Sequence, residues 1–350
     1  MLQRRRKVIL GIIIVLVAGA LLYQARGILG HTGLSGRELL KAVRGARISL
    51  LLLSLLGIYL CYALRALRWM RFSRHLGPAS FWNIYEMTLA GFSVMFLLGR
   101  AADPIRPLLL ARKERQPVAD TFGIYALERL FDTASTAVIA AIGLLLLPLR
   151  SGETGITAGL ERAARSVGLG LFAGVIVVAG IIVYLRLHGS AMLERRLEGW
   201  RVAHGWRAAT ARTVLGFLRG IQTIRSWGDL AAAVFYSTAH WGLIALIYDL
   251  VSTSFGGRLA EIGLGGATLL MAFSIVGSTV QLPAIGGGSQ VGTIVAYTAI
   301  FGVEREPAVV AAIVVWLITF ASCSIVGVPL LIREGFSLGE LRRMAHQEEK

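Results

Sequence analysis

The chain has 350 residues, 55% of them hydrophobic, with a mean hydropathy of +0.68. Soluble domains are roughly 45–50% apolar, so this composition excludes an ordinary soluble globular protein. The formal net charge is +16, but the basic residues gather at the ends of apolar runs, as in membrane proteins facing anionic headgroups, so we expect no nucleic-acid partner. Most of the apolar runs reach the roughly 20 residues that cross a bilayer. They cover 8–23, 48–64, 81–98, 124–149, 167–185, 230–251, 265–285 and 308–332.

The sequence contains no recognisable constellation for catalysis. Neither GxSxG nor HExxH occurs, and the six histidines are scattered. Cys61 and Cys323 both lie in apolar runs and are interpreted as small packing residues. We therefore expect no enzyme, no metal and no cofactor. The basic start before run 8–23 resembles a signal peptide, but we expect an uncleaved first helix.

Counting Lys and Arg in the connections predicts the topology. If all eight runs cross with the N-terminus in the cytoplasm, 16 basic residues lie inside and 19 outside, against the positive-inside rule. If runs 81–98 and 265–285 instead enter and leave on one side, 25 lie inside and 10 outside. This count includes 65–74 among the cytoplasmic connections. Segment 26–47 then lies outside despite its five basic residues and is interpreted as an amphipathic surface helix.

The resulting prediction is an all-α integral membrane protein with six spanning helices, two re-entrant helical hairpins and both termini in the cytoplasm. The hairpins open to opposite sides, an inverted-repeat arrangement typical of alternating-access transporters. We expect one transmembrane domain over 1–350. Its parts are a first helix with an external amphipathic segment (8–47), a first repeat (48–149, hairpin 81–112), a connecting helix with a basic cytoplasmic segment (150–228), a second repeat (229–332, hairpin 265–302) and a cytoplasmic tail (333–350).

The first hairpin carries charge where the helix must break. Pro104 and Pro107 interrupt the helical pattern, which predicts a descent to residue 98, a turn over 99–104 and a return over 105–112. Arg100, Asp103 and Arg106 would line a polar cavity, where arginine can bind a lipid phosphate through two hydrogen bonds. The alternative is an interfacial turn whose arginines extend to water.

The next helix contains ALERLFD, in which Glu128, Arg129 and Asp132 share one side at i,i+3 and i,i+4 spacing. Buried charges need partners, and the arginines of the preceding hairpin are the nearest in sequence. A static ion-pair clamp on that hairpin and a titrating or substrate-contacting role both remain open. His240 lies in the middle of a later helix, either as a functional group or as a hydrogen-bonding member of the bundle.

The second hairpin contains the helix break QLPAIGGGSQVG, beginning at Gln281. Gly286, Gly287 and Gly288 permit close approach of the backbone. The amides near Ser289 and Gln290, at the start of the following helix, can bind an anionic group. A purely structural kink is the alternative.

RALRW (65–69), the block 99–132 and LPAIGGGSQVGTIVAYTAIFGV (282–303) together resemble one family. It is the membrane region of lysylphosphatidylglycerol synthases, with its stand-alone flippase-like relatives. Arg106, Glu128, Arg129 and Asp132 match the family pattern. A glutamate usual before the hairpin arginine is replaced by Asp103-Pro104, and a glutamate common after the glycines by Ser289-Gln290-Val291, which weakens any proton-coupled mechanism carried over.

The resemblance implies movement of a phospholipid or lipid-linked anion between leaflets, because no soluble aminoacyl-transferase part is present in this sequence. We therefore expect a flippase-type transporter of the plasma (inner) membrane with anionic membrane lipids as partners; a homo-oligomer is also possible. The alternatives are a membrane enzyme acting on a lipid headgroup or polyprenyl carrier, and a non-transporting membrane scaffold.

Overall fold

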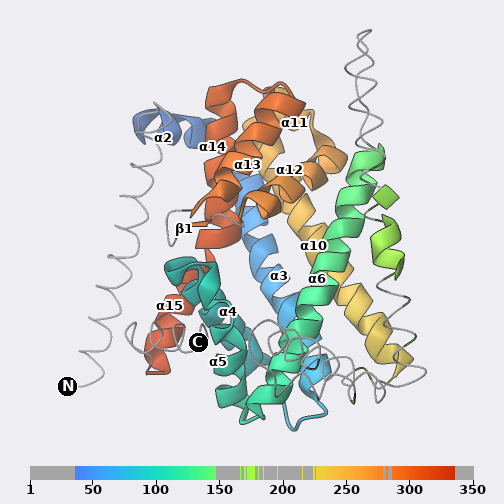
Figure 1. Cartoon of the computed structure of the whole chain (residues 1–350). Coiled ribbons are helices and arrows are strands. Elements are labelled where there is room, and N and C mark those ends of the chain that lie inside the picture. The colour runs from blue at the N-terminus through green and yellow to red at the C-terminus, as the bar shows by residue number, and fades with distance from the viewer. Residues whose placement is uncertain are drawn as a thin grey trace, which may run out of the picture. The chain divides into compact units, whose positions relative to one another are not determined.

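The computed structural model describes residues 36–146, 226–278, 281–282 and 286–335, with scattered residues between 166 and 224. The regular elements are helices apart from two strands of two residues each, which confirms the all-α class (Figure 1). The elements are α2 (Gly36–Gly45), α3 (Ile48–Ser73), α4 (Phe81–Leu98), η1 (Arg100–Ala102), α5 (Ile105–Glu114), α6 (Val118–Leu146), α10 (Trp227–Phe255), α11 (Gly257–Ala260), α12 (Gly263–Gly277), β1 (Gln281–Leu282), β2 (Gly286–Gly287), α13 (Gly288–Val295), η2 (Ala296–Ile300), α14 (Arg305–Trp316), η3 (Leu317–Ala321) and α15 (Cys323–Arg333).

Within the described residues, four helices are long and apolar enough to cross a membrane. They are α3, α4, α10 and the continuous helix formed by α14, η3 and α15. The predicted first helix at 8–23, about half of the run 167–185, nearly all of the basic segment 186–225 and the tail from 336 lie outside the described residues. The expected six spans, the re-entrant hairpins and the orientation therefore remain predictions.

The chain forms two compact units, which are described separately. One comprises Met1–Tyr62, Tyr85–Arg106 and Leu243–Lys350, and the other comprises Ala63–Ile84 and Pro107–Gly242. We call them the hairpin unit and the ion-pair unit. Helices α3, α4, α5 and α10 each begin in one unit and end in the other.

The core of the hairpin unit is α14, whose residues from Ala308 to Trp316 are all buried. A helix that is apolar and buried on every side is typical of the centre of a membrane bundle. Its continuation α15 contacts α4 closely, since a Cβ added at Gly327 would lie 2.4 Å from the Leu89 carbonyl oxygen. The amphipathic helix expected within 26–47 is observed as α2, and the Arg47 amide behind it donates to the Ser254 carbonyl at 2.8 Å.

The ion-pair unit contains the C-terminal part of α3, most of α5, α6 and the first half of α10. Its apolar packing includes Phe72 of α3 against Phe131 of α6, with ring centroids 6.2 Å apart. Ile124 and Leu127 of α6 are fully buried, as is Ala233 of α10. α3 and α6 therefore pack through aromatic side chains, and α6 and α10 each bury apolar residues in this unit.

Candidate functional site

A network of buried ion pairs joins α3 to α6 in the ion-pair unit. Arg65 Nη1 lies 2.8 Å from both Glu128 Oε1 and Asp132 Oδ2. Arg68 Nη2 lies 2.9 Å from Glu128 Oε1 and 2.8 Å from Asp132 Oδ1. All four side chains are at most 7% exposed. The spacing of the arginines (i,i+3) and of the acids (i,i+4) gives each pair one helix face, so each guanidinium reaches both carboxylates.

Helix α10 completes this network with neutral groups. Arg65 Nε donates to Nε2 of His240 at 3.0 Å, and Arg68 Nη1 donates to the Ser237 hydroxyl at 2.6 Å. The Trp241 indole N–H donates to Asp132 Oδ1 at 3.2 Å. His240 therefore takes part in the hydrogen bonding of the bundle, and a functional role for it remains a prediction. The network ties three helices together.

Arg129 is the more exposed cation of the group, with a side chain 36% exposed. Its Nη2 lies 3.4 Å from Asp132 Oδ2 and 3.7 Å from Glu128 Oε1, and its Cζ lies 5.3 Å from the centre of the Tyr125 ring. With Arg65 and Arg68, three guanidinium groups face two carboxylates. The network therefore carries an excess positive charge on its exposed side.

The structure gives Glu128 and Asp132 partners that the sequence interpretation did not consider. The sequence interpretation paired these acids with the arginines of the first hairpin, whereas the structure pairs them with Arg65 and Arg68. It also counted those two arginines as connection charges, although both are buried within α3. The sequence signal that was missed is the pair of arginines three residues apart in RALRW. This motif directly continues the apolar run at 48–64, which indicates that both arginines lie on one face of the same helix.

The first predicted hairpin forms from α4, η1 and α5. Gly99 has φ 89°, a left-handed conformation that glycine adopts readily, and the 3₁₀ turn η1 follows it. Pro104 lies just before α5 and Pro107 in its first turn, where proline is tolerated. Helices α4 and α5 run antiparallel. Gly91, in the middle of α4, faces Arg106 at the start of α5, and the amide of Ser80, just before α4, donates to Glu114 Oε2 at the end of α5 at 2.8 Å.

Arg106 is enclosed by α4. Its side chain is 1% exposed, and its Cβ and Cγ lie 2.6 Å from the position that a Cβ on Gly91 would take. Its Cζ lies 5.3 Å from the centre of the Phe92 ring, a cation–π geometry. Arg106 is therefore buried against protein, while the membrane depth of this turn remains a prediction.

The tips of the two hairpins meet within the hairpin unit. Arg100 Nη2 donates to the hydroxyl of Ser278, the residue that ends α12. The Ser278 hydroxyl in turn donates to the Ile275 carbonyl at 2.6 Å. Asp103, half-buried, ends the η1 turn with its amide donating to the Arg100 carbonyl. The structure thus brings the first predicted helix break beside the second.

In the second hairpin, α12 and α13 contact each other closely through backbone atoms, and we call this contact the glycine seam. A Cβ on Gly277 would lie 2.0 Å from the Gly288 carbonyl oxygen, and one on Gly292 would lie 2.3 Å from the Phe273 carbonyl oxygen. Helices α12 and α13 therefore run antiparallel side by side, as Figure 1 shows. The break between them pairs β1 with β2 in antiparallel register, Gln281 opposite Gly287. This short ladder was not predicted.

Helix α13 begins with buried polar side chains. Gly287 has φ 106°, and its amide donates to the Gln290 side chain. Ser289 is 1% exposed, and among the residues that the structure describes its hydroxyl has no hydrogen-bond partner. For Gln281 and Gly286 the structure describes the backbone alone.

The predicted site residues thus fall into two groups. Arg100, Asp103, Arg106, Gln281 and 286–290 belong to the hairpin unit, whereas Glu128, Arg129, Asp132 and His240 belong to the ion-pair unit. Among the described residues, no set of three or more His, Cys, Asp or Glu side chains lies close enough together to hold a metal ion.

These features define a multi-pass helical membrane protein with two interrupted helical hairpins and a buried ion-pair network. Residues 8–327 match the family model described as the lysylphosphatidylglycerol synthase TM region. Because the match covers most of the chain, the protein belongs to this family, which confirms the resemblance seen in its sequence and relates the protein to lipids. No curated protein matches the chain.

Proposed function

We propose that the protein moves an anionic phospholipid, or another lipid-linked anion, between the two leaflets of a membrane. The observation that carries this proposal is the contact between Arg100 and Ser278, which brings two interrupted helical hairpins tip to tip. Interrupted helices at membrane depth, with irregular backbone facing a cavity, are the recurring design of binding sites in secondary transporters.

In this proposal the two hairpins are re-entrant and open to opposite sides of the membrane. Arg100 and Arg106 neutralise the lipid phosphate, since guanidinium groups bind phosphate through paired hydrogen bonds. The N-terminal amides of α13 and the buried hydroxyl of Ser289 face the same anion from the second hairpin. Alternating exposure carries the headgroup across while the acyl chains remain in lipid.

The buried ion pairs act as structural support in this proposal. Glu128 and Asp132 hold α3 and α6 together through Arg65 and Arg68, so they supply a rigid frame. Arg129, with its partly exposed guanidinium, adds a positive charge that attracts an anionic headgroup. The chain has no carboxylate at 289–291, so proton coupling at that position is not part of the proposal.

The test is lipid translocation in proteoliposomes, with fluorescent phosphatidylglycerol in the outer leaflet and a membrane-impermeant quencher. Gly91→Ala places a methyl group 2.6 Å from Arg106 Cβ and Cγ and so displaces that side chain without altering its charge. A displaced guanidinium loses its hydrogen bond to the phosphate, which is worth about 1.5–3 kcal/mol for a charged group, so we expect the rate to fall about tenfold or more. Arg106→Gln should do at least the same.

Gly242→Ala is the matched control, because a Cβ at Gly242 meets no atom within 4 Å. It should translocate lipid at the rate of the unaltered protein. The proposal fails if the unaltered protein moves no phosphatidylglycerol faster than empty liposomes, or if Gly91→Ala and Arg106→Gln are both as active as Gly242→Ala.

A further inference from the structure

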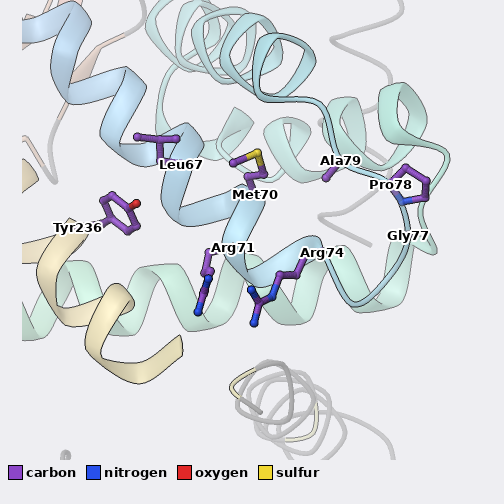
Figure 2. Close-up of a pocket in the computed structure, with 8 residues that line it drawn as sticks. All are labelled: Leu67, Met70, Arg71, Arg74, Gly77, Pro78, Ala79 and Tyr236. Atoms are coloured by element: carbon purple, nitrogen blue, oxygen red, sulfur yellow. The ribbon is translucent and has the colours of Figure 1, made fainter. Parts of the chain in front are cut away.

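A cavity of about 660 Å³ opens in the ion-pair unit, and its lining includes none of the residues of the buried network (Figure 2). It lies between the C-terminal end of α3, the loop that follows it and one side chain of α10. Its lining consists of Leu67, Met70, Arg71, Arg74, Gly77, Pro78, Ala79 and Tyr236. Four of these residues come from α3 at a spacing of three to four, which places them along one face of that helix.

The cavity is apolar along part of its wall and cationic along the rest. Leu67, Met70 and Tyr236 supply the apolar part. Arg71 and Arg74 lie side by side and point the same way, with side chains 36% and 43% exposed (Figure 2). An apolar wall beside accessible guanidinium groups matches a ligand that has both a hydrocarbon part and an anionic part.

Asp229 orients the two arginines but neutralises only one of them. Its Oδ1 accepts from Arg71 Nε at 2.8 Å and from Arg74 Nη2 at 2.9 Å. Its Oδ2 accepts from the amide and the hydroxyl of Ser226, at 3.0 and 2.8 Å. The Asp229 amide donates back to that hydroxyl at 3.0 Å, a reciprocal cap on α10. One carboxylate thus fixes two guanidinium groups and leaves an excess positive charge.

Exposed tryptophans mark the depth of the cavity. Trp227 begins α10 and is 57% exposed, and Trp82, in the first turn of α4, is 67% exposed. Tryptophan is enriched at the membrane–water interface, where its ring lies among the headgroups. Trp227 is two residues before Asp229, and Trp82 is three residues after Ala79. The arginines therefore lie at headgroup level, with the apolar wall toward the hydrocarbon.

We propose that this cavity binds one anionic glycerophospholipid as a resident lipid rather than as cargo. Its phosphate accepts hydrogen bonds from Arg71 and Arg74, and its glycerol and upper acyl chain lie along Leu67, Met70 and Tyr236. The lipid bridges the end of α3, the loop at 77–79 and the start of α10. This site is independent of the proposed transport, because it uses none of the residues assigned to translocation.

Native mass spectrometry of the full-length, delipidated protein tests the proposal. The probe is dioctanoyl phosphatidylglycerol, compared with dioctanoyl phosphatidylcholine, glycerol 3-phosphate and inorganic phosphate. We expect one tightly bound phosphatidylglycerol, with Arg71→Gln and Arg74→Gln each weakening it about tenfold through loss of a charged hydrogen bond. Arg305→Gln, which removes an exposed arginine of α14, is the matched control and should bind as the unaltered protein does.

Ala79→Trp keeps both arginines and fills the cavity, so it should abolish phosphatidylglycerol binding even if an arginine variant folds poorly. Equal affinity for phosphatidylcholine refutes the anionic requirement. Equal affinity for glycerol 3-phosphate or inorganic phosphate, unaffected by Ala79→Trp, shows a simple anion site and refutes the lipid. Phosphatidylglycerol binding that survives Ala79→Trp and both arginine variants overturns the proposal. Because binding is read directly as mass, its failure is distinct from a failure of translocation.

Discussion

Removing one charge from the buried network should destabilise the protein strongly. In Glu128→Gln the side chain keeps its shape but no longer neutralises Arg65 and Arg68, whose Nη atoms lie 2.8 and 2.9 Å from Oε1. Three guanidinium groups then face Asp132 alone. Both arginines are nearly inaccessible to water, at 7% and 1% side-chain exposure, so solvent cannot compensate for the lost carboxylate.

Breaking a buried ion pair by removing one partner costs about 3–5 kcal/mol. At roughly 2 °C per kcal/mol for a chain of this size, thermal unfolding in detergent should occur about 5–10 °C lower. Glu261→Gln removes an exposed carboxylate just after α11 and should shift the midpoint by less than about 1 °C. The assay is intrinsic-fluorescence unfolding of both variants beside the unaltered protein.

A double variant tests whether the loss of stability comes from unbalanced charge or from lost packing. Glu128→Gln with Arg68→Gln removes one buried acid and one buried base and leaves Arg65 paired with Asp132. The network therefore carries less excess positive charge than in Glu128→Gln alone. The two changes should therefore be less than additive, by about 0.5–3 kcal/mol. The reasoning is refuted if Glu128→Gln unfolds at the temperature of Glu261→Gln, or if the double variant is strictly additive.

Two further predictions concern helix contacts. Gly277→Ala places a methyl group 2.0 Å from the Gly288 carbonyl oxygen, so it should lower the unfolding midpoint by several degrees. Gly265→Ala, on the same helix, is the control, because its methyl group meets no atom within 4 Å. Equal midpoints for the two variants would contradict the close contact between α12 and α13. Ser226→Ala removes the reciprocal cap with Asp229 and should cost about 1 kcal/mol. Its midpoint should fall by about 2 °C in the same assay; an unchanged midpoint would show that the cap contributes nothing.

The helix breaks could be predicted from sequence because their causes are local. Pro104 and Pro107 disfavour one continuous helix through 99–107, although Pro107 is tolerated in the first turn of α5, and the glycines at 286–288 permit non-helical backbone, so both interruptions occur where local residue types favour them. The acidic face of α6 was predictable for the same reason, since Glu128 and Asp132 are neighbours on one helix.

The partners of those acids could not be predicted, because they depend on tertiary packing. Arg65 lies more than 60 positions before Glu128, and no local rule relates the two helices. Nearness in sequence favoured Arg100 and Arg106, and that criterion did not identify Arg65 and Arg68. The same limit applies to Arg100 and Ser278, which are separated by 178 positions and whose contact is seen in the structure alone.

The glycine seam of the second hairpin also limits how its sequence can change. Where two side chains meet, a larger residue on one helix can be offset by a smaller one on the other. At Gly277 and Gly292 the facing atoms are main-chain carbonyl groups, whose volume is the same for every residue type. No substitution at Gly288 or Phe273 can make room for a methyl group there, so these two glycines have no second-site suppressors across the seam.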